Sequence, residues 1–286
     1  GVELQDGSFK DLSFVSEQQI DIEQSYTLLH GKQKSCHFQA VQKALLFENA
    51  HGEKIQIEFC VSNEAVAFRY TLSGPHESPM TISKELTGFH VPEGSKAWMQ
   101  PYDKPDTYTP AYEAYFQNGV QPDTKSPTGC GWAFPALFSL YNDKIWILLT
   151  EVNQDANYCG CHLDDADSSG VFQIRFPEPL EAEGLGSVEP ASCLPWTTPW
   201  RIVLISNSPK GIVESTVVTD LSAPQKLQDT SWVKPGRVSW SWWSDMLSPQ
   251  DCTKLRRFVD LAAKMNWEYS LVDANWTIMK NGTIHD

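Results

Sequence analysis

Apolar and polar residues alternate along much of the first 235 positions. The clearest cases are residues 54–61 (KIQIEFCV) and 65–72 (AVAFRYTL), each bounded by turn residues. A two-residue period of this kind is typical of half-buried strands. Further strands are predicted at Ser13–Val15, Tyr26–Leu29, Val41–Phe47, Lys144–Thr150, Val171–Phe176 and Trp200–Ile205. Because no ten-residue stretch here has a clean 3.6-residue period, we expect a large antiparallel β-sandwich over residues 1–235.

The pattern changes after Gly236. Residues 238–242 (VSWSW) predict a short strand, and apolar residues then recur every three or four positions from about 250 to 265. That spacing indicates an amphipathic helix, which Pro249 and Asp251 would begin. Residues 269–273 (YSLVD) predict a second strand. A strand, a helix and a strand of these lengths form a βαβ unit, so the two strands should be parallel.

This second part is too short to be complete. A (β/α)₈ barrel needs roughly 200–250 residues, and only residues 236–286 follow the sandwich. We therefore expect residues 236–286 to be the start of a truncated barrel and the remainder of the catalytic barrel to be missing from the chain. The alternative is that these two strands join another sheet.

Composition separates the two parts as well. The chain has 286 residues and a net charge of −14, with 22 Lys and Arg against 36 Asp and Glu. An acidic surface repels phosphate backbones and anionic headgroups, which argues against nucleic-acid and membrane-surface binding. The longest apolar stretch, Ala133–Tyr141, is about half of a membrane span, so no span is expected. Residues 1–235 carry the whole excess charge, because residues 236–286 hold six bases and six acids.

Three residues of the second part lie where parallel α/β folds place their active sites. Asp273 ends the second predicted strand, Trp276 follows it, and Trp243 lies at the corresponding end of the first strand. An exposed indole suits a sugar, because the axial C–H face of the sugar stacks on an aromatic plane. We therefore expect Asp273, Trp243 and Trp276 to bind substrate. The alternatives are that Asp273 caps a turn and that Trp276 only packs.

Glu151 is the most unusual carboxylate of the first part. It directly follows the apolar segment 144–150 (KIWILLT). A carboxylate there is costly unless it reaches solvent, a cation or a hydrogen-bond donor. Carboxylates suit calcium, so Glu151 is a candidate metal ligand. An ordinary surface carboxylate is the alternative.

Three further segments carry a resemblance. They are residues 197–203 (TTPWRIV), 229–243 (DTSWVKPGRVSWSWW) and 267–276 (WEYSLVDANW). In this order they resemble glycoside hydrolase family 97. Residues 131–138 (GWAFPALF) and 149–151 (LTE) are similar to the N-terminal domain of that family, and the likeness runs from about residue 100 to the end.

The resemblance implies a fold and an activity. It implies an N-terminal β-supersandwich joined to a catalytic (β/α)₈ barrel, with exo-acting hydrolysis of terminal α-linked glucose or galactose from oligosaccharides. It also implies calcium near the sugar, bound partly by a glutamate at the position of Glu151, and a pocket role for Trp276. Because the catalytic carboxylates of the family lie on later barrel strands, we expect no catalytic residue in this chain.

Two other functions are the alternatives, although the spacing of the seven histidines does not support the second of them. One is a non-catalytic carbohydrate-binding sandwich with residues 236–286 as an appendage. The other is a mutarotase-like sandwich, which requires a histidine and a carboxylate that converge in a groove. For the parent glycosidase we expect a bacterial periplasmic or extracellular location, although the chain carries no signal peptide.

Overall fold

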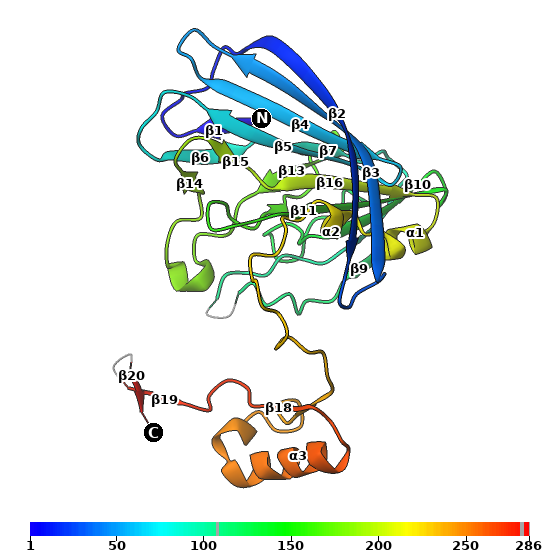
Figure 1. Cartoon of the computed structure of the whole chain (residues 1–286), viewed down its shortest axis with the longest axis vertical. Helices are drawn as coiled ribbons and strands as arrows, with labels where there is room; N and C mark the ends of the chain where they lie inside the picture. Colours follow the sequence, from blue (N-terminus) through cyan, green and yellow to red (C-terminus); the bar gives the residue numbers. More distant parts are fainter. Residues whose placement is uncertain (107–108, 281–282, 286) are drawn as a thin grey trace. The chain divides into compact units, whose positions relative to one another are not determined.

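The chain forms two compact units, Gly1–Ala223 and Pro224–Asp286 (Figure 1). The computed structural model describes residues 1–106, 109–280 and 283–285. The sequence places the change of character after residue 235, whereas the compact units divide earlier, between Ala223 and Pro224. Each unit is described by itself. Within the described residues, no helix has the length and apolar content needed to cross a membrane.

The first unit is built on one ten-stranded antiparallel sheet. Its strands, in spatial order, are β2 (Ser13–Thr27), β3 (Ser35–Glu48), β4 (Lys54–Ser62), β5 (Ala65–Ser73), β16 (Trp200–Ser206), β11 (Ile145–Val152), β10 (Ala136–Leu140), β8 (Lys96–Met99) and β9 (Gln117–Val120), and β15 (Trp196–Thr197) pairs with β5. Neighbouring strands pair antiparallel throughout. The predicted antiparallel architecture is therefore confirmed.

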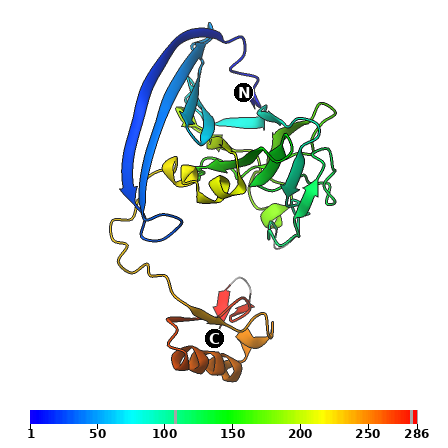
Figure 2. The same ribbon diagram turned by 90° about the vertical axis from the view of Figure 1, so that its right-hand side faces the viewer.

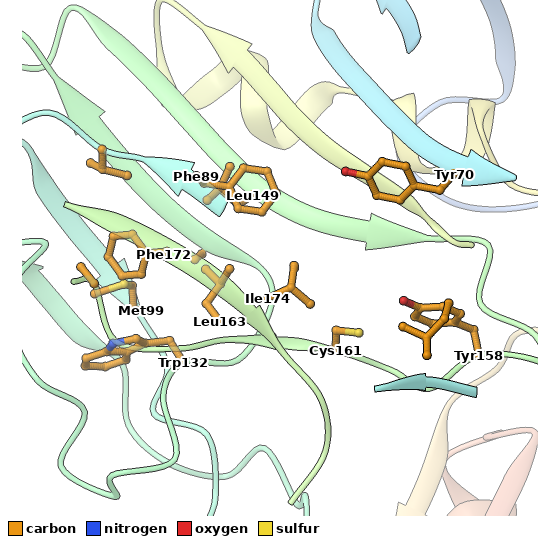
Figure 3. Close-up of a cluster of buried hydrophobic side chains, with 14 of the residues drawn as sticks. Tyr70, Phe89, Met99, Trp132, Leu149, Tyr158, Cys161, Leu163, Phe172 and Ile174 are labelled. Carbon is orange, nitrogen blue, oxygen red and sulfur yellow. The ribbon is translucent and has the colours of Figure 1, made fainter. Parts of the chain in front are cut away.

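Two three-stranded sheets share a core with the large sheet. They are β1 (Val2–Leu4), β6 (Met80–Glu85) and β14 (Ala191–Ser192), and β12 (His162–Leu163), β13 (Val171–Arg175) and β7 (Gly88–His90). Side chains from all three sheets, including Leu72, Ile82 and Phe172, are buried in one cluster. Figure 3 shows this core, with Trp132 and Met99 on one side and Cys161 and Tyr158 on the other. The unit is a sandwich because each sheet buries one face against the other layer.

The opposite face of the large sheet has a second core. The short helices α1 (Pro209–Glu214) and α2 (Val217–Asp220) bury Ile212 and Val217 against this face. β11 consequently buries residues on both sides, Leu149 in the first core and Leu148 beside the second. This double burial explains why residues 144–150 are apolar without alternation.

β2 is one long strand where the sequence predicts two short ones. It pairs with β3 along its whole length, with a register shift between Phe14 and Ser16. Figure 2 shows the two strands as a long curved pair. Almost all of β2 is exposed on both faces. An edge strand that buries neither face needs no apolar alternation, and its polar middle therefore gave no strand signal.

The second unit contains a parallel strand pair. β17 (Val238–Trp240) and β18 (Tyr269–Leu271) pair in parallel, with η2 (Ser248–Gln250) and α3 (Cys252–Lys264) between them in the chain. β19 (Ile278–Lys280) and β20 (Thr283–His285) form a separate hairpin. The Asp251 carboxylate caps α3 by accepting hydrogen bonds from the amides of Thr253 and Lys254. The predicted helix and its two parallel flanking strands are present, each within a few residues of the expected bounds.

Candidate functional site

Glu151 and Arg201 lie directly opposite each other on adjacent strands. The antiparallel register of β11 and β16 pairs Glu151 with Arg201, as it pairs Leu149 with Val203 two residues away. Side chains two residues apart share a face, so Glu151 and Arg201 project from the same face as Leu149, into the first core. The guanidinium Nη1 donates to Glu151 Oε2.

Glu85 reaches the same guanidinium from the other layer. It ends β6, and its carboxylate accepts two hydrogen bonds from Arg201, from Nε at 2.9 Å and from Nη2 at 2.5 Å. The Tyr158 hydroxyl donates to Glu85 Oε2 at 2.8 Å. Arg201 and Glu85 are both fully buried. Burial alone would raise the pKa of Glu85, but the charge and hydrogen bonds of Arg201, together with those of Thr87 and Tyr158, hold that pKa below its ordinary value.

The Glu151 carboxylate is less well compensated. Its second oxygen accepts a hydrogen bond from the amide of Cys161 at 2.8 Å. Burial nevertheless raises the pKa of Glu151, although the charge of Arg201 opposes this effect. The side chain is almost fully buried, so the interpretation of Glu151 as a surface carboxylate is wrong. A strand end that appears exposed in the sequence is covered here by the segment around Cys161.

The charges of this buried centre do not balance. Glu85 and Glu151 are two carboxylates, and Arg201 is the one guanidinium that pairs with both. With both carboxylates ionised, two negative charges share one guanidinium. Burial is the main cause of the raised pKa of Glu151, and the charge of Glu85 adds to it. Among the described residues, no group of three or more His, Cys, Asp or Glu side chains could hold a metal ion. Within the described residues, Glu85 is the acidic side chain that shares the Arg201 guanidinium with Glu151.

An aromatic wall adjoins the centre. The imidazole of His162, the residue after Cys161, stacks on Tyr102 with ring centroids 3.7 Å apart and planes 8° from parallel. Burial, followed by the charge of Arg175, lowers the pKa of His162 to about 3, so the ring is neutral at physiological pH. The Tyr102 hydroxyl donates to Glu181 Oε2 at 3.0 Å. A neutral stacked pair provides a rigid support beside Glu151.

The mutarotase-like alternative requires a histidine next to a carboxylate, and the sandwich has such a pair. His76 Nε2 lies 2.9 Å from Glu53 Oε1. Glu53 also accepts hydrogen bonds from the amide of Phe9 and the side chain of Asn49, and it is buried. A carboxylate engaged by three donors stabilises the turn around Asn49 and offers little free basicity to a substrate.

The three predicted substrate-binding residues lie in the second unit. Asp273 accepts a hydrogen bond from Trp240 Nε1 at 2.7 Å and caps the following turn through the amide of Ala274. Trp243 packs on Trp240 with ring centroids 5.2 Å apart, yet 84% of its surface is exposed. Trp276 is also exposed. The parallel pair therefore brings Asp273, Trp240 and Trp243 together at the carboxyl ends of β17 and β18, and Asp273 has the capping role as well.

Sequence reasoning missed Arg201, Glu85 and Tyr158. Arg201 stands inside a segment that was singled out only for its resemblance, residues 197–203. A usable signal was present, because an arginine within the apolar strand 200–205 (WRIVLI) requires a buried carboxylate partner. Glu85 has no comparable signal, since it stands in a mixed segment between Lys84 and Leu86.

The fold and this centre define a β-sandwich domain with two buried carboxylates on one arginine, followed in the chain by a unit with a parallel strand pair. The family model "Glycosyl-hydrolase 97 N-terminal" matches residues 1–224. The chain therefore belongs to glycoside hydrolase family 97. The recognition from the sequence is confirmed.

Several known proteins are similar to the chain. A probable retaining alpha-galactosidase of Streptomyces bingchenggensis is 26% identical over 257 residues, which cover 89% of this chain and 36% of that protein. A retaining alpha-galactosidase of Bacteroides thetaiotaomicron is 23% identical over 246 residues, or 78% of this chain and 37% of that protein. The chain thus spans little more than a third of the length of these curated relatives.

Two solved structures extend the comparison. The crystal structure of a beta-arabinopyranosidase matches with a TM-score of 0.85 and 32% identity, over 96% of this chain and 45% of that one. A glycoside hydrolase family 97 enzyme of Pseudoalteromonas sp. strain K8, in complex with panose, matches with a TM-score of 0.77 and 23% identity, over 96% and 43% of the two chains. The second likeness shows the fold alone.

Proposed function

We propose that this chain is the N-terminal part of an exo-acting glycosidase that releases terminal α-linked glucose or galactose from oligosaccharides. The observation that carries the proposal is the family match over residues 1–224, which covers the whole sandwich. The retaining alpha-galactosidases among its relatives support a neutral saccharide substrate. The proposal includes a periplasmic or extracellular location, which fractionation of the source cells would test.

Glu151 fits one ligand position of a calcium site. The buried centre pairs two carboxylates with one guanidinium. The Glu151 carboxylate accepts hydrogen bonds from Cys161, Arg201 and Gln154. A carboxylate has about four acceptor positions, so one stays free for a cation, and calcium prefers carboxylate oxygens. Because calcium takes about 6–8 oxygen ligands, the others would come from groups outside this centre. When bound, the cation would supply positive charge close to the sugar.

Arg201 and Cys161 are positioning residues in this proposal. Arg201 is held by two hydrogen bonds to Glu85, so its guanidinium cannot turn away from Glu151. The Cys161 amide holds the other oxygen of Glu151. A carboxylate fixed at both oxygens is oriented before a ligand arrives, which lowers the entropic cost of binding.

The second unit would contribute to the sugar pocket. Asp273 is oriented by Trp240 and lies at the carboxyl ends of the parallel strands. The exposed rings of Trp243 and Trp276 provide apolar planes for a sugar. The catalytic carboxylates would lie on strands that follow these two, where one protonates the glycosidic oxygen and the other acts as nucleophile or base.

The test is hydrolysis of p-nitrophenyl α-glucoside and α-galactoside with added calcium. The enzyme is this chain extended through the residues that follow it in its gene. Release of p-nitrophenol from either substrate supports the proposal, and release from neither contradicts it. The 286-residue chain alone is the control, and we expect it to be inactive.

A second candidate substrate is a terminal β-arabinopyranoside. The observation in its favour is the 32% identity to a beta-arabinopyranosidase over 96% of the chain. A β-L-arabinopyranoside has the ring configuration of an α-D-galactopyranoside and lacks its hydroxymethyl group. Adding p-nitrophenyl β-L-arabinopyranoside to the same assay decides between the two, because a pocket closed at that position accepts the pentoside and rejects the hexoside.

A further inference from the structure

Three aromatic side chains are exposed on one segment between β8 and β9. Tyr112 is 52% exposed, Tyr115 is 93% exposed and Phe116 is 45% exposed. Single exposed aromatic residues are common, but three within five positions form a concentrated apolar surface. Apart from Glu113, the segment 111–116 (AYEAYF) carries no charge. Its chemistry therefore suits a neutral ligand with apolar faces.

The segment is held in place by side chains at its base. Asp103 Oδ2 accepts hydrogen bonds from the amides of Ala111 at 2.8 Å and Tyr112 at 2.9 Å. Gln100 Nε2 donates to the carbonyl oxygens of Tyr112 at 2.7 Å and Ala114 at 2.8 Å. Tyr112 has a φ of 56°, which is unfavourable for a tyrosine and requires such support. Aromatic rings on a fixed backbone bind with a small loss of entropy.

A continuous series of contacts joins this segment to Glu151. The Tyr112 ring meets the Tyr102 ring edge to face at 6.2 Å. Tyr102 stacks on His162, and the neighbouring Cys161 donates its amide to Glu151. Burial raises the pKa of Tyr112, and the negative charges of Glu181 and Glu151 raise it further. The Tyr112 hydroxyl thus lies within electrostatic range of Glu151.

We propose that Tyr112, Tyr115 and Phe116 bind the sugar units on the leaving-group side of an oligosaccharide. This inference rests on the proposed function, in which Glu151 marks the end of the sandwich nearest the reacting sugar. An exo-acting enzyme encloses only the terminal unit, so the remaining units emerge next to that end. Tyr112 is linked to the Glu151 region through Tyr102 and His162, and Tyr115 and Phe116 continue the exposed aromatic surface from Tyr112. The emerging units would meet these rings, on which sugar C–H faces stack.

The first experiment measures binding by the 286-residue chain itself. Maltotetraose and stachyose are the two probes, titrated separately and followed by saturation-transfer NMR and calorimetry. We expect at least one of them to bind, and the Y115A/F116A variant to bind it about 3- to 10-fold more weakly, as expected for lost aromatic stacking. Tyr115 is almost fully exposed, so its replacement leaves the fold intact, which circular dichroism verifies.

Tyr141→Ala is the matched control. Tyr141 is 63% exposed and lies in the turn between β10 and β11, outside the aromatic segment. Its replacement should leave the dissociation constant unchanged. The proposal is overturned if the chain binds neither probe, or if Y115A/F116A binds as tightly as Y141A.

A second measurement separates this proposal from the proposed function. In the extended enzyme, Y115A/F116A should raise KM for the oligosaccharide more than KM for the p-nitrophenyl glycosides, because the single p-nitrophenyl group occupies only the nearest leaving-group position. If the extended enzyme cleaves those glycosides while the chain binds no oligosaccharide, the aromatic surface is refuted and the glycosidase function stands. If the chain binds an oligosaccharide and the extended enzyme cleaves nothing, the function is refuted and the surface stands.

Discussion

Arg201 is fully buried, and each of its hydrogen bonds described above ends on another buried group. Moving a guanidinium and two carboxylates out of water is costly, and the cost is recovered only where the geometry is good. The pair with Glu85 meets that condition through its bidentate contact and the Tyr158 hydroxyl. Glu151 has a single guanidinium nitrogen, the Cys161 amide and the Gln154 side chain, which do not offset its burial, so the pKa values of the two carboxylates are shifted in opposite directions.

Replacing Glu85 with glutamine should destabilise the sandwich strongly. One amide N–H₂ would face the Arg201 guanidinium, and Arg201 would lose the better of its two carboxylate partners. We expect a loss of about 3–5 kcal/mol in the free energy of unfolding at pH 7, the usual result of removing one member of a buried ion pair. Urea unfolding measures it. Glu214→Gln on α1, which breaks an exposed pair with Lys210, is the control and should change little.

Replacing Glu151 with glutamine should stabilise the fold, in contrast to the replacement of Glu85. The pKa of Glu151 is raised above its ordinary 4.5 in the folded chain, so its ionised form destabilises the fold. That cost is present above the folded-state pKa and disappears as the pH falls through it toward 4.5. In chelator, E151Q should therefore melt above the parent at pH 7–8, and the difference should shrink as the pH falls to 4.5. A lower melting temperature for E151Q at pH 7 would contradict this account.

The pH dependence of E85Q provides a comparison. The folded-state pKa of Glu85 lies below its ordinary 4.5, so ionised Glu85 stabilises the fold above pH 4.5. This stabilisation is lost as the pH falls through the lower folded-state pKa. The loss of unfolding free energy in E85Q should therefore persist across pH 5–8 and decline only in more acidic solution.

At the scale of elements, strand register and helix capping position the candidate site residues. The antiparallel register of β11 and β16 sets Glu151 against Arg201. A slip of one residue in either strand would turn that strand's member of the pair away from the core. In the second unit, α3 connects two strands that must run parallel, so its start determines where β18 returns. Asp251 defines that start by capping two amides.

Asp251→Ala should therefore loosen the first turn of α3. Loss of an N-cap costs about 1 kcal/mol, so the amides of Thr253 and Lys254 should exchange with solvent about fivefold faster. Hydrogen exchange followed by NMR measures this rate. Asp251→Asn keeps an acceptor at the same position and should exchange nearly as slowly as the parent. Equal rates in D251A and D251N would refute the capping role.

At the scale of the whole molecule, the chain has two compact units joined by exposed backbone. Residues 222–238 are exposed except for Thr230, and they contain no helix or strand before Val238. The sandwich has its own two cores, which include residues only from 1–223. It should therefore be stable when the connection is cut.

Limited proteolysis tests this independence. Trypsin should cleave first after Lys226, and chymotrypsin after the exposed Trp232. The product that retains the sandwich should resist further digestion and unfold at the same temperature as the sandwich in the intact chain. Mass spectrometry identifies the cuts. Cleavage inside residues 1–223 as fast as cleavage after Lys226 or Trp232 would show that the sandwich depends on the second unit.

Much of the fold could be predicted from local sequence, because period-two alternation identifies strands that bury one face and a 3.6-residue period identifies α3. β2 could not be predicted in full, since an edge strand exposed on both faces has no such period. At the candidate site, Glu151 was noticed because it follows an apolar strand. Its burial was not predictable, because the covering segment around Cys161 is placed by the fold.

The sequence by itself determined the strand content, the βαβ pattern and the membership of glycoside hydrolase family 97. Only the tertiary structure decided that Glu85, Glu151 and Arg201 form one buried centre. Arg201 is 116 positions from Glu85 and 50 positions from Glu151 along the chain. Strand register and the stacking of two layers bring these groups together, and neither depends on residues that are local in sequence.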